Sequence, residues 1–162
     1  MIDLSRKPEI LHERRTIEYD AEHWTILSKL RKRACDLLRD LKDAGLRGFT
    51  YGSISRGDVT KNSDIDIILM DVIPSYRVEL SVGKGIKREL VQATPSSVLK
   101  AHLHVDHGIV ISFPMFKMMS REREFYKWGG MVGLQELESD IRVPGVDKRL
   151  VLIEPNEKGH SE

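Results

Sequence analysis

The sequence predicts a small fold of the α+β type (α/β-like), in which a mixed β-sheet is backed by helices. Three observations support this fold class: a long amphipathic helix near the N-terminus, a short acidic strand, and two β-rich runs that flank a turn. Helices and strands that alternate in this way pack best with the helices lying against one sheet.

The first strong element is a helix predicted over residues 20–44. Asp20 is a good N-cap because its carboxylate can accept hydrogen bonds from the amides of the first turn, and Gly45 is a natural end for the helix. The other face of the helix, which includes Arg31, is charged and is expected to be solvated. Apolar residues recur every three or four positions and form one stripe: Trp24, Leu27, Leu30, Ala34, Leu37, Leu38 and Leu41.

The remaining elements follow in order along the chain. Strands are predicted over residues 49–51, 64–70 and 87–93, and a hairpin is predicted from the runs 99–105 and 109–113. Helices are predicted from Ser75, over 120–128 with Ser120 as N-cap, and over 132–140. A last apolar run covers residues 150–153.

Length and composition favour one domain with a hydrophobic core. The 162 residues divide into a predicted N-terminal arm (1–18), a domain (19–154) and a polar tail (155–162). A net charge of +1 argues against a protein that coats nucleic acid, but it is compatible with a local basic patch. A single cysteine, the lack of an apolar leader and the lack of about 18 consecutive apolar residues lead us to expect a cytoplasmic protein outside the membrane.

Two neighbouring motifs carry the chemistry. The segment Tyr51-Gly52-Ser53-Ile54-Ser55-Arg56-Gly57 precedes the acidic strand Ser63-Asp64-Ile65-Asp66-Ile67. Residues i and i+2 of a strand share one face, so Asp64 and Asp66 lie side by side. Adjacent carboxylates repel each other unless a cation neutralises them, and hard oxygen ligands favour Mg²⁺, which usually brings phosphates.

The upstream turn has the residue types that phosphates require. Gly52 lets the backbone approach a phosphate closely, Ser53 can donate a hydrogen bond to it, and the Arg56 guanidinium matches a pair of phosphate oxygens. The alternative, that Asp64 and Asp66 only line the solvent face of an edge strand, does not account for the Gly-Ser and Arg-Gly pairs upstream.

Together these residues resemble the DNA polymerase beta-like nucleotidyltransferase superfamily, over roughly residues 20–72. The resemblance implies a minimal, stand-alone nucleotidyltransferase domain that moves a nucleoside monophosphate from ATP or another nucleotide triphosphate to an acceptor and releases pyrophosphate. It implies two Mg²⁺ ions held by Asp64 and Asp66, with the triphosphate bound by Gly52, Ser53 and Arg56. The acceptor (RNA, protein or small molecule), the base preference and the oligomeric state stay open.

One feature of the superfamily has no clear counterpart here. Its members usually supply a third carboxylate from a later strand, and the run Ile109–Phe113 contains Ser112 but no acid. Asp106, just before that run, and Glu89 are the two candidates, with Asp106 taken as the third catalytic residue. If neither reaches the site, the chain would be a nucleotide-binding or regulatory domain that turns over slowly.

A histidine cluster offers a rival interpretation. The segment His102-Leu103-His104-Val105-Asp106-His107 resembles the zinc motif of metallo-β-lactamase-fold hydrolases. In that fold the motif leads into a helix and needs further ligands downstream, whereas here a β-rich run follows and only His160 remains. The alternative is a purely structural role, in which the histidines lie on the polar face of a hairpin strand.

The helix predicted over residues 120–128 combines cations with aromatic residues. Its spacing favours Phe125 and Trp128 facing inward, and the alternative is a surface that stacks and clamps a nucleic acid acceptor. The basic turn over residues 142–149 has no pattern that assigns it a role.

Overall fold

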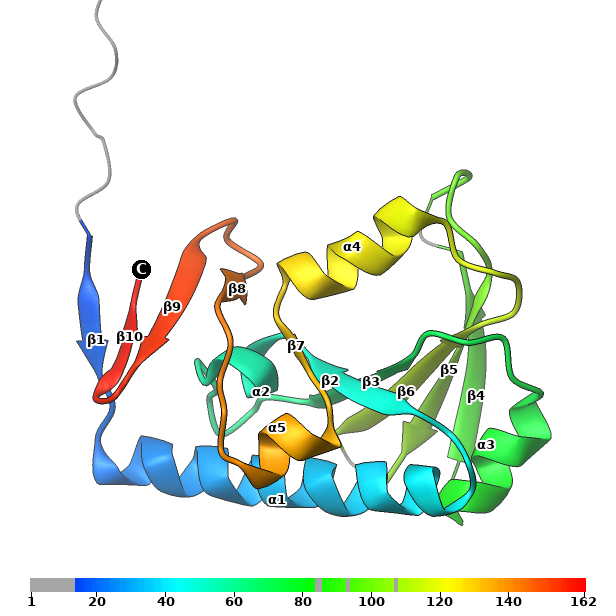
Figure 1. The fold of residues 1–162 in the computed structure, drawn as a ribbon, viewed down its shortest axis with the longest axis horizontal. Helices are drawn as coiled ribbons and strands as arrows, with labels where there is room; N and C mark the ends of the chain where they lie inside the picture. Colours follow the sequence, from blue (N-terminus) through cyan, green and yellow to red (C-terminus); the bar gives the residue numbers. More distant parts are fainter. Residues whose placement is uncertain (1–13, 84–85, 93, 107) are drawn as a thin grey trace, which may run out of the picture.

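The computed structural model describes residues 14–83, 86–92, 94–106 and 108–162, which form two β-sheets and five helices (Figure 1). The larger sheet has six strands in the order β4-β5-β6-β3-β2-β7, and the smaller sheet has four in the order β1-β10-β9-β8. Within the larger sheet β3 and β6 run parallel and the other pairs run antiparallel. The mixed sheet that the sequence predicts is therefore present.

The elements that the sequence predicts lie within a few residues of the observed bounds, whereas β1, β7, β8 and β10 are not among the predicted elements. The larger sheet contains β2 (Gly48–Tyr51), β3 (Ile65–Leu69), β4 (Ile86–Val91), β5 (Lys100–Val105), β6 (Ile109–Pro114) and β7 (Met131–Val132). The smaller sheet contains β1 (Thr16–Glu18), β8 (Gly145–Val146), β9 (Leu152–Asn156) and β10 (Gly159–Ser161). The helices are α1 (Ala21–Asp43), α2 (Ser53–Arg56), α3 (Ser75–Val82), α4 (Ser120–Trp128) and α5 (Leu134–Glu138).

The long helix α1 begins where its cap predicts. The Oδ1 atom of Asp20 accepts a hydrogen bond from the His23 amide at 2.8 Å, which satisfies one free amide of the first turn. The apolar stripe is buried or half-buried as expected. The expectation that Arg31 is solvated is wrong. The side chain is buried and donates hydrogen bonds to the carbonyl oxygens of Ile54 and Ile141.

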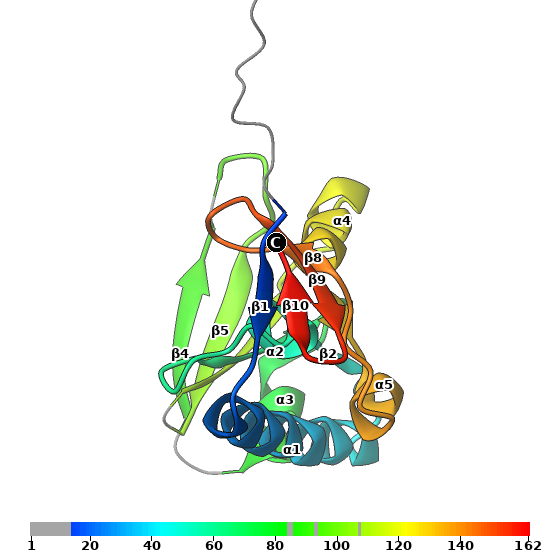
Figure 2. The same ribbon diagram turned by 90° about the vertical axis from the view of Figure 1, so that its left-hand side faces the viewer.

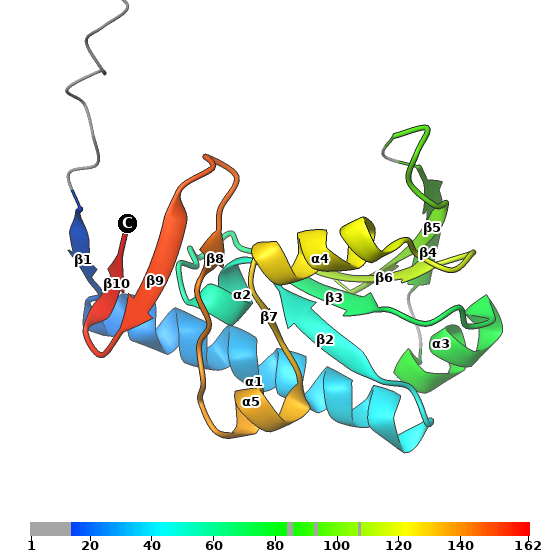
Figure 3. The same ribbon diagram turned by 45° about the horizontal axis from the view of Figure 1, so that its top comes forward.

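Helices cover both faces of the larger sheet. Helix α1 lies against one face together with α3 and α5, and α4 lies over the opposite face (Figures 1 and 3). The alternation of β3 explains this arrangement: Ile65 and Ile67 pack in the α1 cluster, whereas Ile68 packs with Met118 and Tyr126 on the α4 side. The α4 face of β3 is the face that carries the two aspartates.

The two ends of the described chain pair with each other. Strand β1 lies beside β10, with Ile17 opposite His160, and the backbones of Arg15 and Glu162 exchange two hydrogen bonds of 2.8 Å (Figure 2). The described part of the predicted arm and much of the predicted polar tail thus belong to the smaller sheet rather than lying outside the domain. Residues 1–13 of the arm lie outside the described residues.

A few element boundaries differ from the predicted ones. Met119, not Ser120, is the N-cap of α4, and the Glu122 carboxylate accepts the Met119 amide at 3.0 Å. Helix α5 is shorter than the range 132–140, and β4 ends at Val91, while residue 93 lies outside the described residues. Among the described residues, the helices are all too short or too polar to cross a bilayer.

Candidate functional site

A sharp turn joins β2 to the short helix α2 and forms one wall of the site. Gly52 has φ +82°, a conformation that glycine adopts without the strain other residues incur. The Gly52 amide donates to the carbonyl of Gly130 at 3.0 Å, and the hydroxyls of Thr50 and Ser55 lie 2.9 Å apart in the interior. These bonds hold the turn, and Ser53 beside it lines a cavity.

Asp64 and Asp66 lie next to this turn on one face of the acidic strand. Asp64 is exposed and Asp66 is half-buried. A Cβ atom on Gly52 would lie 4.0 Å from the Oδ2 atom of Asp66, and one on Gly108 would lie 3.4 Å from the Oδ1 atom of Asp64. The two carboxylates therefore occupy the space between the Gly52 turn and the turn that joins β5 to β6.

The surroundings of Asp66 disfavour its ionised form. Burial raises the pKa of Asp66 above its ordinary value, the neighbouring Asp64 raises it further, and Lys148 opposes the shift. A divalent cation between the two carboxylates would relieve both effects, so the pair fits one Mg²⁺ ion. Among the described residues no group of three His, Cys, Asp or Glu side chains could hold a metal.

The same electrostatics predict a stability effect for Asp66→Asn. An acid whose folded pKa is raised costs stability when ionised, so the metal-free variant should unfold at a higher temperature than wild type near pH 7, by roughly 1–3 °C. The difference should shrink as the pH falls from the raised pKa toward the ordinary value of 3.8, because the wild type then becomes neutral. Thermal unfolding in a chelator at several pH values measures this effect, and a lower melting temperature for the variant near pH 7 would contradict it.

The carboxylates open into a cavity of about 630 Å³. Its floor comes from β3 and the Gly52 turn, and its other walls come from the end of α4 and from the loop between β8 and β9. It is lined by Tyr51, Gly52, Ser53, Arg56, Asp58, Thr60, Asn62, Ser63, Asp64, Asp66, Phe125, Tyr126, Trp128, Gly129, Val146, Asp147, Lys148, Arg149 and Leu150. Five of the predicted site residues (Gly52, Ser53, Arg56, Asp64 and Asp66) thus lie in one cavity.

Arg56 lies at the cavity but is engaged by the protein itself. Its Nε and Nη2 atoms donate to the two carboxylate oxygens of Asp58 at 2.9 and 3.0 Å, and Nη1 donates to the carbonyl of Gly129 at 2.6 Å. Both side chains of the ion pair are largely buried. Arg56 therefore ties α2 to the end of α4, a structural role that the sequence did not indicate.

The loop between β8 and β9 brings cations to the carboxylates. Lys148 is exposed at the cavity and close enough to Asp66 to lower its pKa. Its neighbour Arg149 donates to Asp147 and to Glu162, each at 2.8 Å, which anchors the loop to the smaller sheet. Sequence reasoning left this turn unassigned because no local spacing links it to residues 64–66, which lie more than 80 positions earlier.

The two candidates for a third carboxylate are not among the residues that line the cavity. Val110 is the residue opposite Asp66 on the parallel strand β6. Asp106 does not line the cavity, and its Oδ2 atom lies 3.7 Å from the Arg33 guanidinium. Glu89 bonds to His104 at 3.0 Å and sits three strands from β3, about 14 Å at ordinary strand spacing.

Two histidines of the rival zinc motif, His102 and His104, share one face of β5. His104 bonds to Glu89, and His102 lies opposite Ser112 of β6. His107 lies outside the described residues, so the full motif is not placed.

The aromatic residues of α4 overturn a prediction. Phe125 and Trp128 are 63% and 51% exposed, and Tyr126 is the residue that points inward, with its ring 5.0 Å from that of Tyr51. Helical spacing is compatible with either Tyr126 or the pair Phe125 and Trp128 facing the sheet, and in the structure Tyr126 packs against it. Both exposed rings line the cavity.

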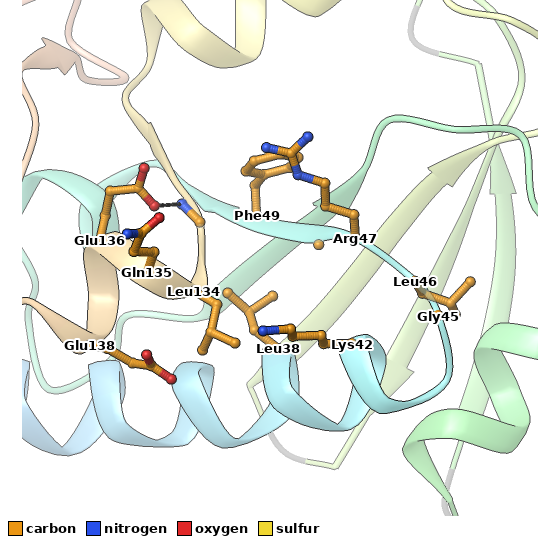
Figure 4. A pocket seen from close by; sticks show the side chains of 12 residues that line it. Leu38, Lys42, Gly45, Leu46, Arg47, Phe49, Leu134, Gln135, Glu136 and Glu138 are labelled. Atoms are coloured by element: carbon orange, nitrogen blue, oxygen red, sulfur yellow. Dashed lines mark hydrogen bonds between the residues drawn. The ribbon is translucent and has the colours of Figure 1, made fainter.

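A second cavity, of about 730 Å³, lies between α1, β2 and α5 (Figure 4). Its carboxylates already have partners: Glu136 accepts the Gly133 amide at 3.1 Å and Glu138 pairs with Arg39 at 3.2 Å. The Arg47 guanidinium lies over the Phe49 ring, 5.0 Å from its centre. No paired carboxylates face each other there, so we place the chemistry in the first cavity.

Comparison with known families agrees with this geometry. A family model described as "Nucleotidyltransferase domain" matches residues 27–114, which is more than half of the chain. The match extends from α1 through β6 and includes the Gly52 turn and both aspartates. No curated protein and no solved structure is significantly similar to the chain.

Proposed function

Because the chain belongs to the nucleotidyltransferase domain family, we propose that it moves a nucleoside monophosphate from a nucleotide triphosphate to an acceptor and releases pyrophosphate. The observation that carries this proposal is the shared cavity, which is lined by Asp64, Asp66 and the Gly52-Ser53 turn. The raised pKa of Asp66 supports it, since a carboxylate pair of this kind is stabilised by a cation.

We assign Mg²⁺ binding to Asp64 and Asp66. When bound, the ion would supply charge neutralisation at the phosphates and orient them for displacement at phosphorus. The resemblance implies two ions, and the aspartate pair fits the first of them; the remaining ligands would be phosphate oxygens and water.

The other residues of the cavity would bind and orient the nucleotide. The triphosphate can approach the backbone of Gly52 closely because glycine has no side chain, and the Ser53 hydroxyl donates a hydrogen bond to it. Lys148, on the opposite wall, neutralises part of its charge. The acceptor hydroxyl oxygen forms a bond to the α-phosphorus while the bond to the bridging oxygen breaks. Pyrophosphate leaves with that electron pair, and the hydroxyl proton passes to solvent water.

Lys148 rather than Arg56 is our choice for the triphosphate cation. Arg56 already donates to Asp58 and Gly129, whereas Lys148 is exposed at the cavity. We expect Lys148→Ala to weaken binding of the Mg²⁺–nucleotide by about 10-fold, the usual effect of losing a charge-assisted hydrogen bond. Isothermal titration calorimetry measures the affinity for the Mg²⁺–nucleotide. The control is Lys158→Ala, because Lys158 is an exposed lysine of the β9–β10 turn that pairs with Glu18. Equal weakening by both variants would show a general charge effect instead.

The proposal as a whole is tested by transfer from labelled nucleotides. Purified protein is incubated with Mg²⁺, each α-labelled nucleotide triphosphate in turn, and a panel of RNA, protein and small-molecule acceptors. We expect label on one acceptor class together with released pyrophosphate. Label that appears equally without Mg²⁺, or with the Asp64→Asn/Asp66→Asn variant, would overturn the proposal.

A second candidate function rests on Val110. Because the strand position beside Asp66 carries an apolar residue, the domain could bind nucleotide and regulate a partner with little turnover. Mg²⁺-dependent nucleotide binding without transfer to any acceptor in the same panel would favour this second function.

A further inference from the structure

The outer face of α4 carries a stripe of exposed aromatic and basic side chains. Arg121, Phe125 and Trp128 are spaced i, i+4 and i+7, so they share one side of the helix. The centres of the two rings lie 6.4 Å apart with their planes tilted by 36°. Exposed rings that adjoin each other, unlike single exposed rings, are typical of interaction sites.

The stripe begins in the cavity and continues beyond it. Phe125 and Trp128 line the same cavity as Asp64 and Asp66, whereas Arg121, one turn earlier on α4, lies outside the lining. Phe116 and Lys117, which precede α4, are also exposed (α4 crosses the upper part of Figure 1). A ligand that covers the whole stripe must be longer than the single nucleotide that the cavity can hold.

The cations of the stripe outnumber its free carboxylates. Arg121 and Lys117 are exposed, and Lys148 stands at the cavity end. Of the two acids of α4, Glu122 turns inward and accepts hydrogen bonds from the amides of Met119 and Val98, and the exposed Glu124 pairs with Lys127 at 3.5 Å. Cations interleaved with exposed rings match a chain of bases and phosphates, since bases stack on the rings and phosphates pair with the cations.

From this arrangement we infer that the acceptor is the end of a single-stranded nucleic acid, which stacks its terminal bases on Phe125 and Trp128 and lays its backbone along Arg121 toward Lys117. This inference rests on the proposed function, because it names the acceptor class of the same site. The aromatic wall then guides the terminal hydroxyl toward the aspartate pair.

Oligonucleotide binding tests this inference separately from catalysis. The fluorescence anisotropy of a labelled single-stranded oligoribonucleotide is measured against wild type and Phe125→Ala/Trp128→Ala in the presence of a chelator. We expect at least a 10-fold loss of affinity in the double variant and near-wild-type affinity for Trp128→Phe, which keeps a stacking ring. The matched control is Tyr76→Ala, which removes a ring of α3 that is 62% exposed.

The outcomes separate the two proposals. Equal oligonucleotide affinity of wild type and Phe125→Ala/Trp128→Ala would overturn the inference. Weaker binding of the Mg²⁺–nucleotide by the double variant, with oligonucleotide affinity unchanged, would also overturn it, because the rings would then serve the donor base. Label transferred to protein or small molecules but not to oligonucleotides would do the same. Aromatic-dependent oligonucleotide binding with no transfer at all would support the inference and count against the proposed reaction.

Discussion

Replacing Asp64 and Asp66 together with asparagine is expected to lower nucleotidyl transfer by on the order of 10³-fold, because the variant keeps the shape of the site but loses both charges that would hold Mg²⁺. Mg²⁺-dependent binding of the nucleotide triphosphate should be lost as well. The initial rate of pyrophosphate release measures the first effect, and calorimetry with and without Mg²⁺ measures the second.

The matched control for this variant is Asp71→Asn. Asp71 is an exposed aspartate two residues after the end of β3 and outside the cavity with the aspartate pair. It tests whether loss of a nearby negative charge is enough to change the rate. Wild-type rates from the double variant, or equal losses from the control, would contradict the metal role of Asp64 and Asp66.

Replacing Arg56 with methionine is expected to destabilise the fold by about 3–5 kcal/mol, because it leaves the Asp58 carboxylate largely buried without its partner. It also removes the hydrogen bond to the Gly129 carbonyl, which joins α2 to the end of α4. In a chain of this length the loss corresponds to a fall of roughly 10 °C or more in melting temperature. Urea unfolding measures the free energy directly.

A control and a second substitution sharpen the result for Arg56. Arg39 pairs with Asp36 and Glu138 on the surface, where solvent screens the charges, so Arg39→Met should cost far less stability than Arg56→Met. Adding Asp58→Asn to the Arg56→Met variant should recover part of the lost stability, since the orphaned charge is then removed. A loss for Arg56→Met as small as that for Arg39→Met would show that the buried ion pair does not hold the site together.

The predictions that succeeded were those that depend on neighbouring residues. The Asp20 cap, the apolar stripe of α1 and the hairpin of β5 and β6 are local patterns whose physics acts within a few positions of the chain. The juxtaposition of Asp64 and Asp66 follows from the pleat of a single strand. The Gly52 turn follows β2 directly, so its place beside that strand was also within reach of sequence reasoning.

The predictions that differed from the structure concern side chains whose partners are distant in the chain. Arg31 and Arg56 could have faced solvent or a ligand. Instead, Arg31 donates a hydrogen bond to the carbonyl oxygen of Ile141, and Arg56 donates one to that of Gly129. On α4 either Tyr126 or the pair Phe125 and Trp128 could have faced the sheet. Helical spacing is compatible with both choices, and only the packing against β2 distinguishes them.

The sequence by itself determined the helix, the acidic strand, the turn at Gly52 and membership of the family, because each rests on short-range periodicity and on residue chemistry. Only the tertiary structure decided that the Lys148 side chain lies near the carboxylates and that the rings of Phe125 and Trp128 face the cavity. The β8–β9 loop carries Lys148 to Asp66, and Arg149 anchors this loop to Glu162, which follows β10 of the smaller sheet. That sheet forms by pairing the two ends of the described chain, and no local pattern encodes such a pairing.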